Sequence, residues 1–245
     1  MPMDQQPHAS WAEVYDQAYE TIYGNQYQQL TKATLELIQS QLGEPPKQII
    51  DFGAGTGRLA VPLAEKGYHV TAVEPCQAML DQLAKKDVHG QIQRICTPMA
   101  EADINEPFDG ALAVFSVIIY LLTKDDLKAS LSAAHQALRP GGMLILDVSQ
   151  KKAFRGSQYN TGMLTRETTV QAEDQGGDLY RYVEKISMAG LDGEINAYRD
   201  EFRSHYWPPQ VIFDTASEVG FSERRDLGEP VYGSGADYYA FIKPE

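Results

Sequence analysis

The residues best suited to hold a ligand lie in positions 49–57, which read IIDFGAGTG. Three glycines here follow an apolar run and precede a helical pattern, so a ligand could approach the backbone closely and meet the free amides of a helix N-terminus. Dinucleotide sites, phosphate sites and purely structural turns also use glycine loops. A dinucleotide fingerprint needs a glycine where this chain has Arg58, and the Gly-Lys-Ser/Thr of a P-loop is missing from these positions.

Glu74 is the second candidate for ligand binding. It ends a predicted strand over residues 69–74, 17 positions after Gly57. A carboxylate at the C-terminal edge of a strand can accept two hydrogen bonds from the diol of a ribose. The alternative is an ordinary acid at the end of a surface strand.

The elements that must position these residues alternate along the chain, which indicates an α/β fold with a doubly wound, mostly parallel sheet. Strands are predicted at 47–52, 69–74, 91–96, 110–116, 143–148, 223–227 and 238–242. Helices are predicted at 58–66, 76–85, 125–138 and 208–219.

Both flanks of this core have other patterns. Residues 11–42 have the apolar spacing of two helices, with Tyr15, Tyr19 and Tyr23 on one face. Residues 165–206 change to period-two stretches divided by turns at 176–177 and 191–193, which indicates a small antiparallel insertion. We therefore expect N-terminal helices forming a lid at 1–44, a core at 45–150 and 207–245, and an acceptor-side insertion at 151–206.

The glycine loop and Glu74, with Phe108-Asp109 before one strand and the sequence LRPGG at 138–142 before another, resemble the class I S-adenosyl-L-methionine-dependent methyltransferases. The resemblance covers about residues 45 to 150 and is closest to enzymes that act on small molecules. It implies a Rossmann-like, seven-stranded sheet, S-adenosyl-L-methionine as cofactor and S-adenosyl-L-homocysteine as product. The implied cofactor contacts are Asp51, Gly53, Ala54, Gly55, Gly57, Glu74, Pro75, Pro98, Met99, Phe115, Ser116, Tyr15 and Tyr23.

One position departs from the family. Where such enzymes often place an acid beside the adenine amino group, this chain has Pro98. Adenine would then be held by backbone groups and apolar contact, with Met99 as a polarizable cover for the ring or as plain core filler.

Three side chains are candidates for catalysis or for positioning the acceptor, and each also has a structural interpretation. His205, beside Tyr206 and Trp207, could act as a base. Tyr120 follows the strand that would lie behind the methionine moiety, and Tyr15 belongs to the predicted lid. His135, inside a predicted helix, is interpreted as structural.

The composition limits the classes of partner that the chain is expected to bind. Thirty-four acidic and 21 basic residues give a formal net charge of -13, which disfavours nucleic acid and anionic membranes. Two cysteines without metal-ligand spacing suit a reducing cytoplasm, and no stretch has the apolar length of a membrane span.

These observations predict transfer of a methyl group to N or O of a small soluble acceptor by a cytoplasmic monomer or homodimer that uses no metal. The alternatives are a non-catalytic S-adenosyl-L-methionine-binding regulatory or interaction protein, and a protein methyltransferase.

Overall fold

The computed structural model describes residues 6–104, 107–173, 175–190 and 194–245. Its core is one seven-stranded sheet with the order β10-β11-β5-β4-β1-β2-β3. The five strands from β5 to β3 pair in parallel, and β10 and β11 are antiparallel, so the predicted mostly parallel α/β fold is confirmed. The strands are β1 (Gln48–Phe52), β2 (His69–Val73), β3 (Gln93–Ile95), β4 (Phe108–Ala113), β5 (Leu138–Ser149), β10 (Glu223–Gly228) and β11 (Ala236–Ile242).

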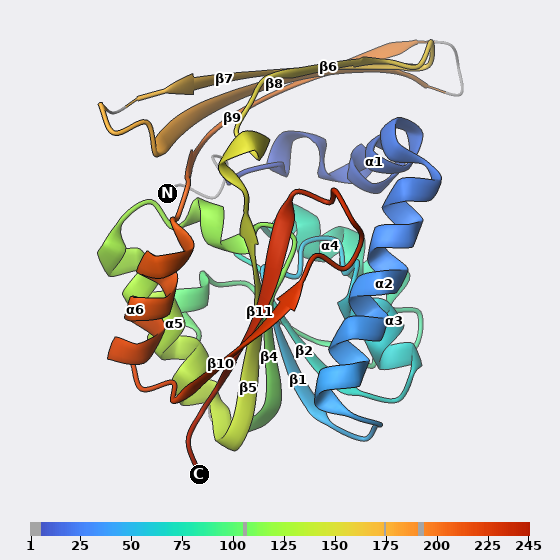
Figure 1. Ribbon diagram of the computed structural model, residues 1–245. Helices are drawn as coiled ribbons and strands as arrows, with labels where there is room; N and C mark the ends of the chain where they lie inside the picture. The colour runs from blue at the N-terminus through green and yellow to red at the C-terminus, as the bar shows by residue number, and fades with distance from the viewer. Residues whose placement is uncertain (1–5, 105–106, 174, 191–193) are drawn as a thin grey trace.

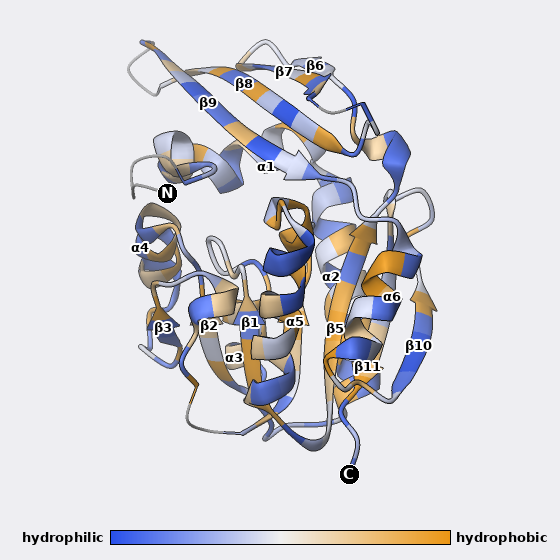
Figure 2. Cartoon of the chain, turned by 90° about the vertical axis from the view of Figure 1, so that its left-hand side faces the viewer, coloured by the Kyte–Doolittle hydropathy of each residue, from blue (hydrophilic) through white to orange (hydrophobic). Residues whose placement is uncertain are grey.

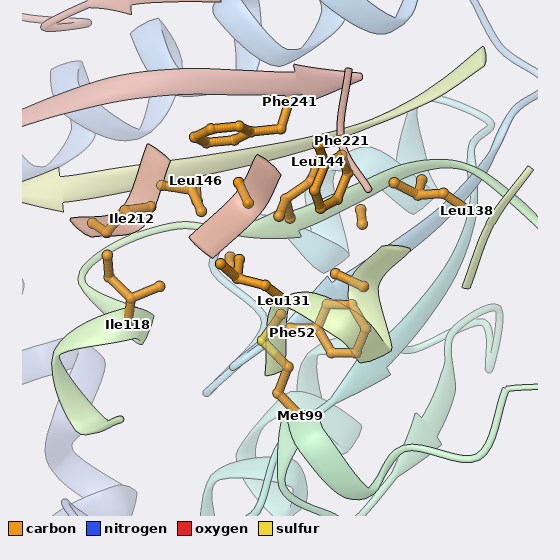
Figure 3. Packing of buried hydrophobic residues seen from close by; sticks show 14 of the residues in the cluster. Phe52, Met99, Ile118, Leu131, Leu138, Leu144, Leu146, Ile212, Phe221 and Phe241 are labelled. Atoms are coloured by element: carbon orange, nitrogen blue, oxygen red, sulfur yellow. The ribbon is translucent and has the colours of Figure 1, made fainter. Parts of the chain in front are cut away.

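Helices cover both faces of this sheet (Figure 1). One apolar core contains residues of α5 and α6, among them Leu131 and Ile212, packed against Phe52, Leu144 and Phe241 of the strands (Figure 3). The opposite core contains residues of α2, α3 and α4. The helices are α1 (Tyr15–Tyr23), α2 (Asn25–Leu42), α3 (Ala60–Glu65), α4 (Gln77–Lys86), α5 (Lys124–Ala137) and α6 (Pro209–Glu218).

Local sequence explains where several elements begin. Thr123 caps α5 because its side chain accepts a hydrogen bond from the Asp126 amide while the Asp126 carboxylate accepts from the Thr123 amide. Pro209 opens α6, where a missing N–H costs nothing. The strand predicted at 143–148 is longer in the structure, where β5 already starts at Leu138. Its pairing with β4 shifts register between Phe108 and Gly110. The LRPGG sequence therefore lies within β5.

A second sheet lies across the carboxyl ends of the core strands (Figure 1). It has the antiparallel order β6-β7-β8-β9 and confirms the predicted small insertion; the turn predicted at 191–193 lies outside the described residues. Hydrophobic and hydrophilic residues alternate along β8 and β9 (Figure 2), as expected for a sheet with one buried face. Its strands are β6 (Ser157–Asn160), β7 (Leu164–Ala172), β8 (Leu179–Ala189) and β9 (Ile195–His205).

The N-terminal segment lies between the two sheets. Trp11 and Ala18 pack with Leu164 and Ile186 of the second sheet. Ala12, in the short 3-10 helix Ala9–Val14, packs instead against residues of α4 and its N-terminus. The first five residues of the predicted lid lie outside the described residues. Among the described residues, no helix combines the length and apolar character needed to span a membrane.

Candidate active site

The glycine loop connects β1 to α3 at the carboxyl edge of the core sheet. Gly53, Gly55 and Gly57 have φ of 68°, 54° and 83°, a region that L side chains rarely adopt. A Cβ at Gly53 would lie 2.6 Å from Val117, whereas at Gly55 the nearest atom would be 3.6 Å away, in Met79. Packing therefore requires glycine at position 53, and backbone conformation requires it at position 55.

Two buried carboxylates lie beside this loop, on neighbouring strand ends. Glu74 follows β2 and accepts hydrogen bonds from the amides of Gly55 and Cys76, each at 3.0 Å. Burial raises the pKa of Glu74, and these two amides oppose the rise. Asp51 in β1 is also buried, and its burial, together with the negative charge of Glu74, raises its pKa to about 7.

This arrangement fits the adenosyl and methionine parts of S-adenosyl-L-methionine. A carboxylate oxygen has lone pairs beyond the one that each amide uses, so Glu74 can still accept from hydroxyl groups. The predicted contacts Asp51, Gly53, Ala54, Gly55, Gly57 and Glu74 lie together on one loop and two adjacent strand ends.

The other predicted adenine-side contacts lie beyond this loop. Pro75 follows Glu74, and its carbonyl accepts a hydrogen bond from the Cys96 thiol. Pro98 immediately precedes a short 3-10 helix, Met99–Glu101. Met99 is 7% exposed and packs in the core beside Phe52 (Figure 3). This placement agrees with the interpretation of Met99 as core filler. A contact between Met99 and adenine stays a prediction.

A cavity of about 630 Å³ lies between the core and the second sheet. Its aromatic lining includes Tyr15, Tyr19, Tyr23, Tyr120, Tyr182 and Phe202. Its lining also contains His8, Arg58, Asp147, Arg166 and Glu184. The cavity thus joins residues of the N-terminal segment, the core strand ends and the second sheet.

The floor of the cavity is a tight bend after β4. Phe115 and Ser116 both have left-handed backbone conformations, with φ of 66° and 67°. The Ser116 amide donates to the buried carboxylate of Asp147, and the hydroxyls of Ser116 and Ser149 lie 2.9 Å apart. Burial raises the pKa of Asp147 to about 7, although the Ser116 amide opposes this shift.

Arg58 connects the glycine loop to α2. Its guanidinium lies 3.8 Å from the ring centroid of Tyr27 and 3.6 Å from that of Phe115. It also donates to the Thr31 hydroxyl at 2.7 Å. The residue that breaks the dinucleotide fingerprint therefore stacks between two aromatic rings at the cavity wall.

A cluster of polar side chains lies where the N-terminal segment meets the second sheet. The Nε2 of His8 is 2.8 Å from the Tyr120 hydroxyl, and the His8 amide donates to Asp200 at 2.6 Å. The His8 Nδ1 lies 3.4 Å from Asp200 Oδ2 and 3.8 Å from Glu184 Oε2. Arg166 donates to Glu184 at 2.5 Å, so a cation is buried beside this carboxylate.

This cluster also has the composition of a small metal site. Donor atoms of His8, Glu184 and Asp200 lie within 4.8 Å of one another. However, Arg166 already binds Glu184, and the His8 amide and the Trp11 indole N–H already donate to Asp200. These donors compete with a cation for Glu184 Oε1 and Asp200 Oδ2, whereas Glu184 Oε2 and His8 Nδ1 have no hydrogen-bond partner among the described residues.

The N-terminal segment covers the glycine loop. The Asp16 carboxylate accepts from the Thr56 hydroxyl at 2.7 Å and from Lys86 at 2.6 Å. Ala12 packs with Cys76 and Met79 at the start of α4. This placement supports the predicted lid, whose role remains a proposal.

Most predicted acceptor-side residues meet at the cavity, and one does not. Tyr15, Tyr23, Phe115, Ser116 and Tyr120 line it. The described residues that line the cavity do not include His205. The His205 ring instead stacks on Trp207, with the ring centroids 4.0 Å apart. The cavity therefore gives no support to His205 as a base. His135 packs edge-on against Phe221, as its structural interpretation predicted.

Several residues at the cavity were not predicted from the sequence, among them His8, Arg166 and Glu184. His8 lies in a polar N-terminal stretch that has no periodic pattern, so the sequence contained no signal for its position. Arg166 and Glu184 lie on adjacent strands and on the buried face of the second sheet. Charged residues at buried-face positions of an alternating pattern are the signal that could have identified them.

Comparison with known proteins agrees with this geometry. Residues 49–142 match the model of a methyltransferase domain. A methyltransferase of Geobacillus kaustophilus (strain HTA426), itself uncharacterized, is 28% identical over 154 residues, which are 59% of this chain and 67% of that protein. Residues 49–142 are thus a methyltransferase domain, and the chain shares its fold with S-adenosylmethionine-dependent methyltransferases. It spans between 42 and 67% of the length of the first curated relatives that it matches.

Solved structures of methyltransferases share the whole fold. An S-adenosylmethionine-dependent methyltransferase from Clostridium acetobutylicum ATCC 824 has a TM-score of 0.80 at 17% identity, covering 95% of this chain and 99% of that one. CalS10, a SAM-bound amino pentose methyltransferase from Micromonospora echinaspora, has a TM-score of 0.72 at 18% identity, covering 94% of this chain and 96% of that one. The methyltransferase fold therefore includes the N-terminal segment and the second sheet.

Proposed function

We propose that this chain transfers the methyl group of S-adenosyl-L-methionine to a nitrogen or an oxygen of a small soluble molecule, and that an amine nitrogen is the better acceptor. The observation that carries the proposal is the cavity's position. Its floor, Phe115 and Ser116, follows β4, which pairs directly with the strand that leads into the glycine loop. An acceptor in the cavity would therefore lie next to the cofactor loop.

The size of the cavity supports a small acceptor. A volume of about 630 Å³ lies within the range of about 300–1,000 Å³ typical of small-molecule sites. The walls come from three separate parts of the chain, which enclose a ligand on several sides.

The chemistry of the walls favours an amine. Tyrosine ring faces can stabilise the positive charge that develops on an amine nitrogen during methyl transfer, and the carboxyl group of Asp147 lies at the same lining. The fold shared with an amino pentose methyltransferase is consistent with such an acceptor.

Catalysis in this site would depend mainly on alignment. The cofactor, when bound, would supply a methyl group on a positively charged sulfur, and a nucleophile that attacks the methyl carbon would displace that sulfur. Glu74 and Asp51 would orient the cofactor through its hydrogen-bond donors, and the Phe115-Ser116 bend would fix the distance between the two sites. The N-terminal segment and the tyrosines would exclude water from the reaction.

The test is a methyl-transfer assay with labelled cofactor and a panel of small amines and matched alcohols. We expect labelled product with at least one amine class, and binding of the cofactor by calorimetry. Cofactor binding without transfer to any small molecule would favour the regulatory alternative. Label on protein in a cell extract would favour the protein methyltransferase. A folded protein that does not bind the cofactor would contradict the proposal.

A further inference from the structure

His8 lies between the two layers of the molecule and contacts both. Its Nε2 faces the Tyr120 hydroxyl, which belongs to the core side of the cavity. Its Nδ1 faces Asp200 on β9 and Glu184 on β8. The His8 side chain is 12% exposed. Aromatic rings enclose it on its other sides: Trp11, Tyr15 and Phe202.

The partners of His8 fix which ring nitrogen carries the proton. Ionised carboxylates only accept hydrogen bonds, so the nitrogen that faces Asp200 and Glu184 is stabilised when it bears hydrogen. In the neutral imidazole, Nε2 is then free to accept from the Tyr120 hydroxyl at 2.8 Å. Among the described residues, Nδ1 of His8 and Oε2 of Glu184 are buried without a hydrogen-bond partner. Neither atom therefore has to give up a hydrogen bond when the charge of His8 changes.

We propose that Tyr120 and His8 carry away the proton of the methylated acceptor nitrogen, with Asp200 and Glu184 as positioning residues for the imidazole. This inference rests on the proposed function. Tyr120 is the group that touches the acceptor, because it lines the cavity, and His8 receives the proton behind it.

The proton and electron count of the step is balanced. The acceptor nitrogen forms a bond to the methyl carbon while the carbon–sulfur electron pair returns to sulfur, leaving a positively charged nitrogen that still bears hydrogen. As this positive charge develops, that proton moves to the Tyr120 oxygen while the Tyr120 hydroxyl proton moves to His8 Nε2. Tyr120 ends as a neutral hydroxyl, His8 ends as an imidazolium, and the proton then leaves to solvent.

The surroundings of Tyr120 favour this concerted route over a free phenolate. Burial raises the pKa of Tyr120 well above its usual range, and the charges of Glu184, Asp200 and Glu74 add to the rise. A hydroxyl that passes one proton on while it accepts another never carries the unfavourable negative charge.

The charged groups that face His8 also balance an imidazolium. Arg166 from β7 is paired with Glu184, so these two charges offset each other. Asp200 from β9 remains as the counter-charge, and it accepts from both the His8 amide and Trp11. Glu74, after β2, is close enough to His8 for their charges to interact. The cluster therefore gains no net unpaired charge when His8 is protonated.

The kinetic test compares Tyr120→Phe and His8→Gln with the wild type on the acceptor identified in the methyl-transfer assay. We expect kcat to fall about 100-fold in each variant, the usual size of a proton-transfer contribution, with KM changed less than about threefold. Acidification should lower the kcat of the wild type more than that of His8→Gln, because a protonated imidazole cannot accept another proton. Added imidazole should restore part of the His8→Gln rate.

His69→Gln, at an exposed histidine on β2, is the matched control and should behave as the wild type. A His8→Gln variant whose kcat falls by the same factor at every pH, without rescue by imidazole, would show a structural role and overturn the proposal. An unchanged kcat in Tyr120→Phe would overturn it equally.

A second readout needs no cofactor. In ¹⁵N-histidine NMR of the full chain, with the His8 signals assigned from His8→Gln, we expect the neutral ring to carry its proton on Nδ1, and Asp200→Asn to weaken this preference. A proton on Nε2 in an active wild type would overturn the relay alone, and absence of methyl transfer by the wild type would overturn the proposed function and the relay with it. Zn²⁺ binding in equilibrium dialysis that His8→Gln abolishes would assign the cluster to a metal and overturn the relay.

Discussion

The carboxylate of Asp147 lies against the main-chain amide of Ser116, with its two oxygens 2.9 and 3.1 Å from the nitrogen. This contact joins the end of β5 to the bend that follows β4, where two consecutive residues other than glycine adopt left-handed conformations. Such conformations persist only where surrounding contacts hold them, and they often occur at functional sites. The buried acid thus stabilises the floor of the cavity.

The buried state of Asp147 gives a pH dependence of stability. Its pKa of about 7 lies above the usual 3.8, so the folded chain binds this proton more tightly than the unfolded chain does. The resulting stability is full below about pH 4 and is lost as the pH rises toward 7. Asp147→Asn avoids this loss, so we expect its Tm relative to the wild type to be about 5–10 °C higher at pH 8 than at pH 5.

The matched control for this measurement is Asp214→Asn, at an exposed position of α6. Its Tm difference from the wild type should be the same at both pH values. An equal difference for Asp147→Asn at pH 5 and pH 8 would show that the carboxyl is ionised throughout this range.

Glu74→Ala should weaken cofactor binding without unfolding the chain. The substitution removes the acceptor for ribose hydroxyls and frees the amides of Gly55 and Cys76. Loss of hydrogen bonds to a charged group corresponds to a Kd about 10- to 100-fold higher, measured by titration calorimetry. Glu65→Ala, at an exposed acid of α3, should bind as the wild type does. Unchanged affinity in Glu74→Ala would refute the assignment.

Gly53→Ala and Gly55→Ala should separate crowding from backbone strain in the loop. Both place a side chain at a positive φ, which costs about 1–2 kcal/mol. Only the change at Gly53 also meets Val117 at 2.6 Å, which adds about 1–3 kcal/mol of overpacking. Urea unfolding should therefore show a larger loss for Gly53→Ala, partly reversed by adding Val117→Ala. Equal losses would contradict the packing described at Gly53.

Glu184→Gln should destabilise the second sheet, because it leaves the Arg166 guanidinium buried without its counter-charge. Breaking one partner of a buried ion pair costs about 3–5 kcal/mol. The double variant Arg166→Met with Glu184→Leu should cost less than Glu184→Gln alone, since no charge remains buried. Denaturant unfolding measures both, and a double variant that is the less stable of the two would contradict this account.

The core and its cofactor loop were predictable because short-range patterns encode them. The apolar run before Gly53 specifies a buried strand, and Glu74 lies where a parallel sheet places an acid beside that loop. The period-two stretches after residue 165 likewise predicted the antiparallel insertion.

The acceptor side was less predictable because its residues meet only in three dimensions. His8 and Asp200 are separated by 192 positions, and no local pattern relates them. The sequence makes His205, beside Tyr206 and Trp207, a candidate base, but its position at the end of β9 stacks it on Trp207. Sequence spacing reveals which residues share an element, whereas this site is assembled from several elements.

The alternation along the second sheet has an evolutionary consequence. Arg166, Tyr182, Glu184 and Phe202 face the cavity from three strands, while the cofactor loop belongs to a separate sheet. Substitutions at these few positions would alter which molecule is accepted and leave the residues that hold the methyl donor in place. New acceptor specificity could thus arise on this scaffold by changing one layer and inheriting the other intact.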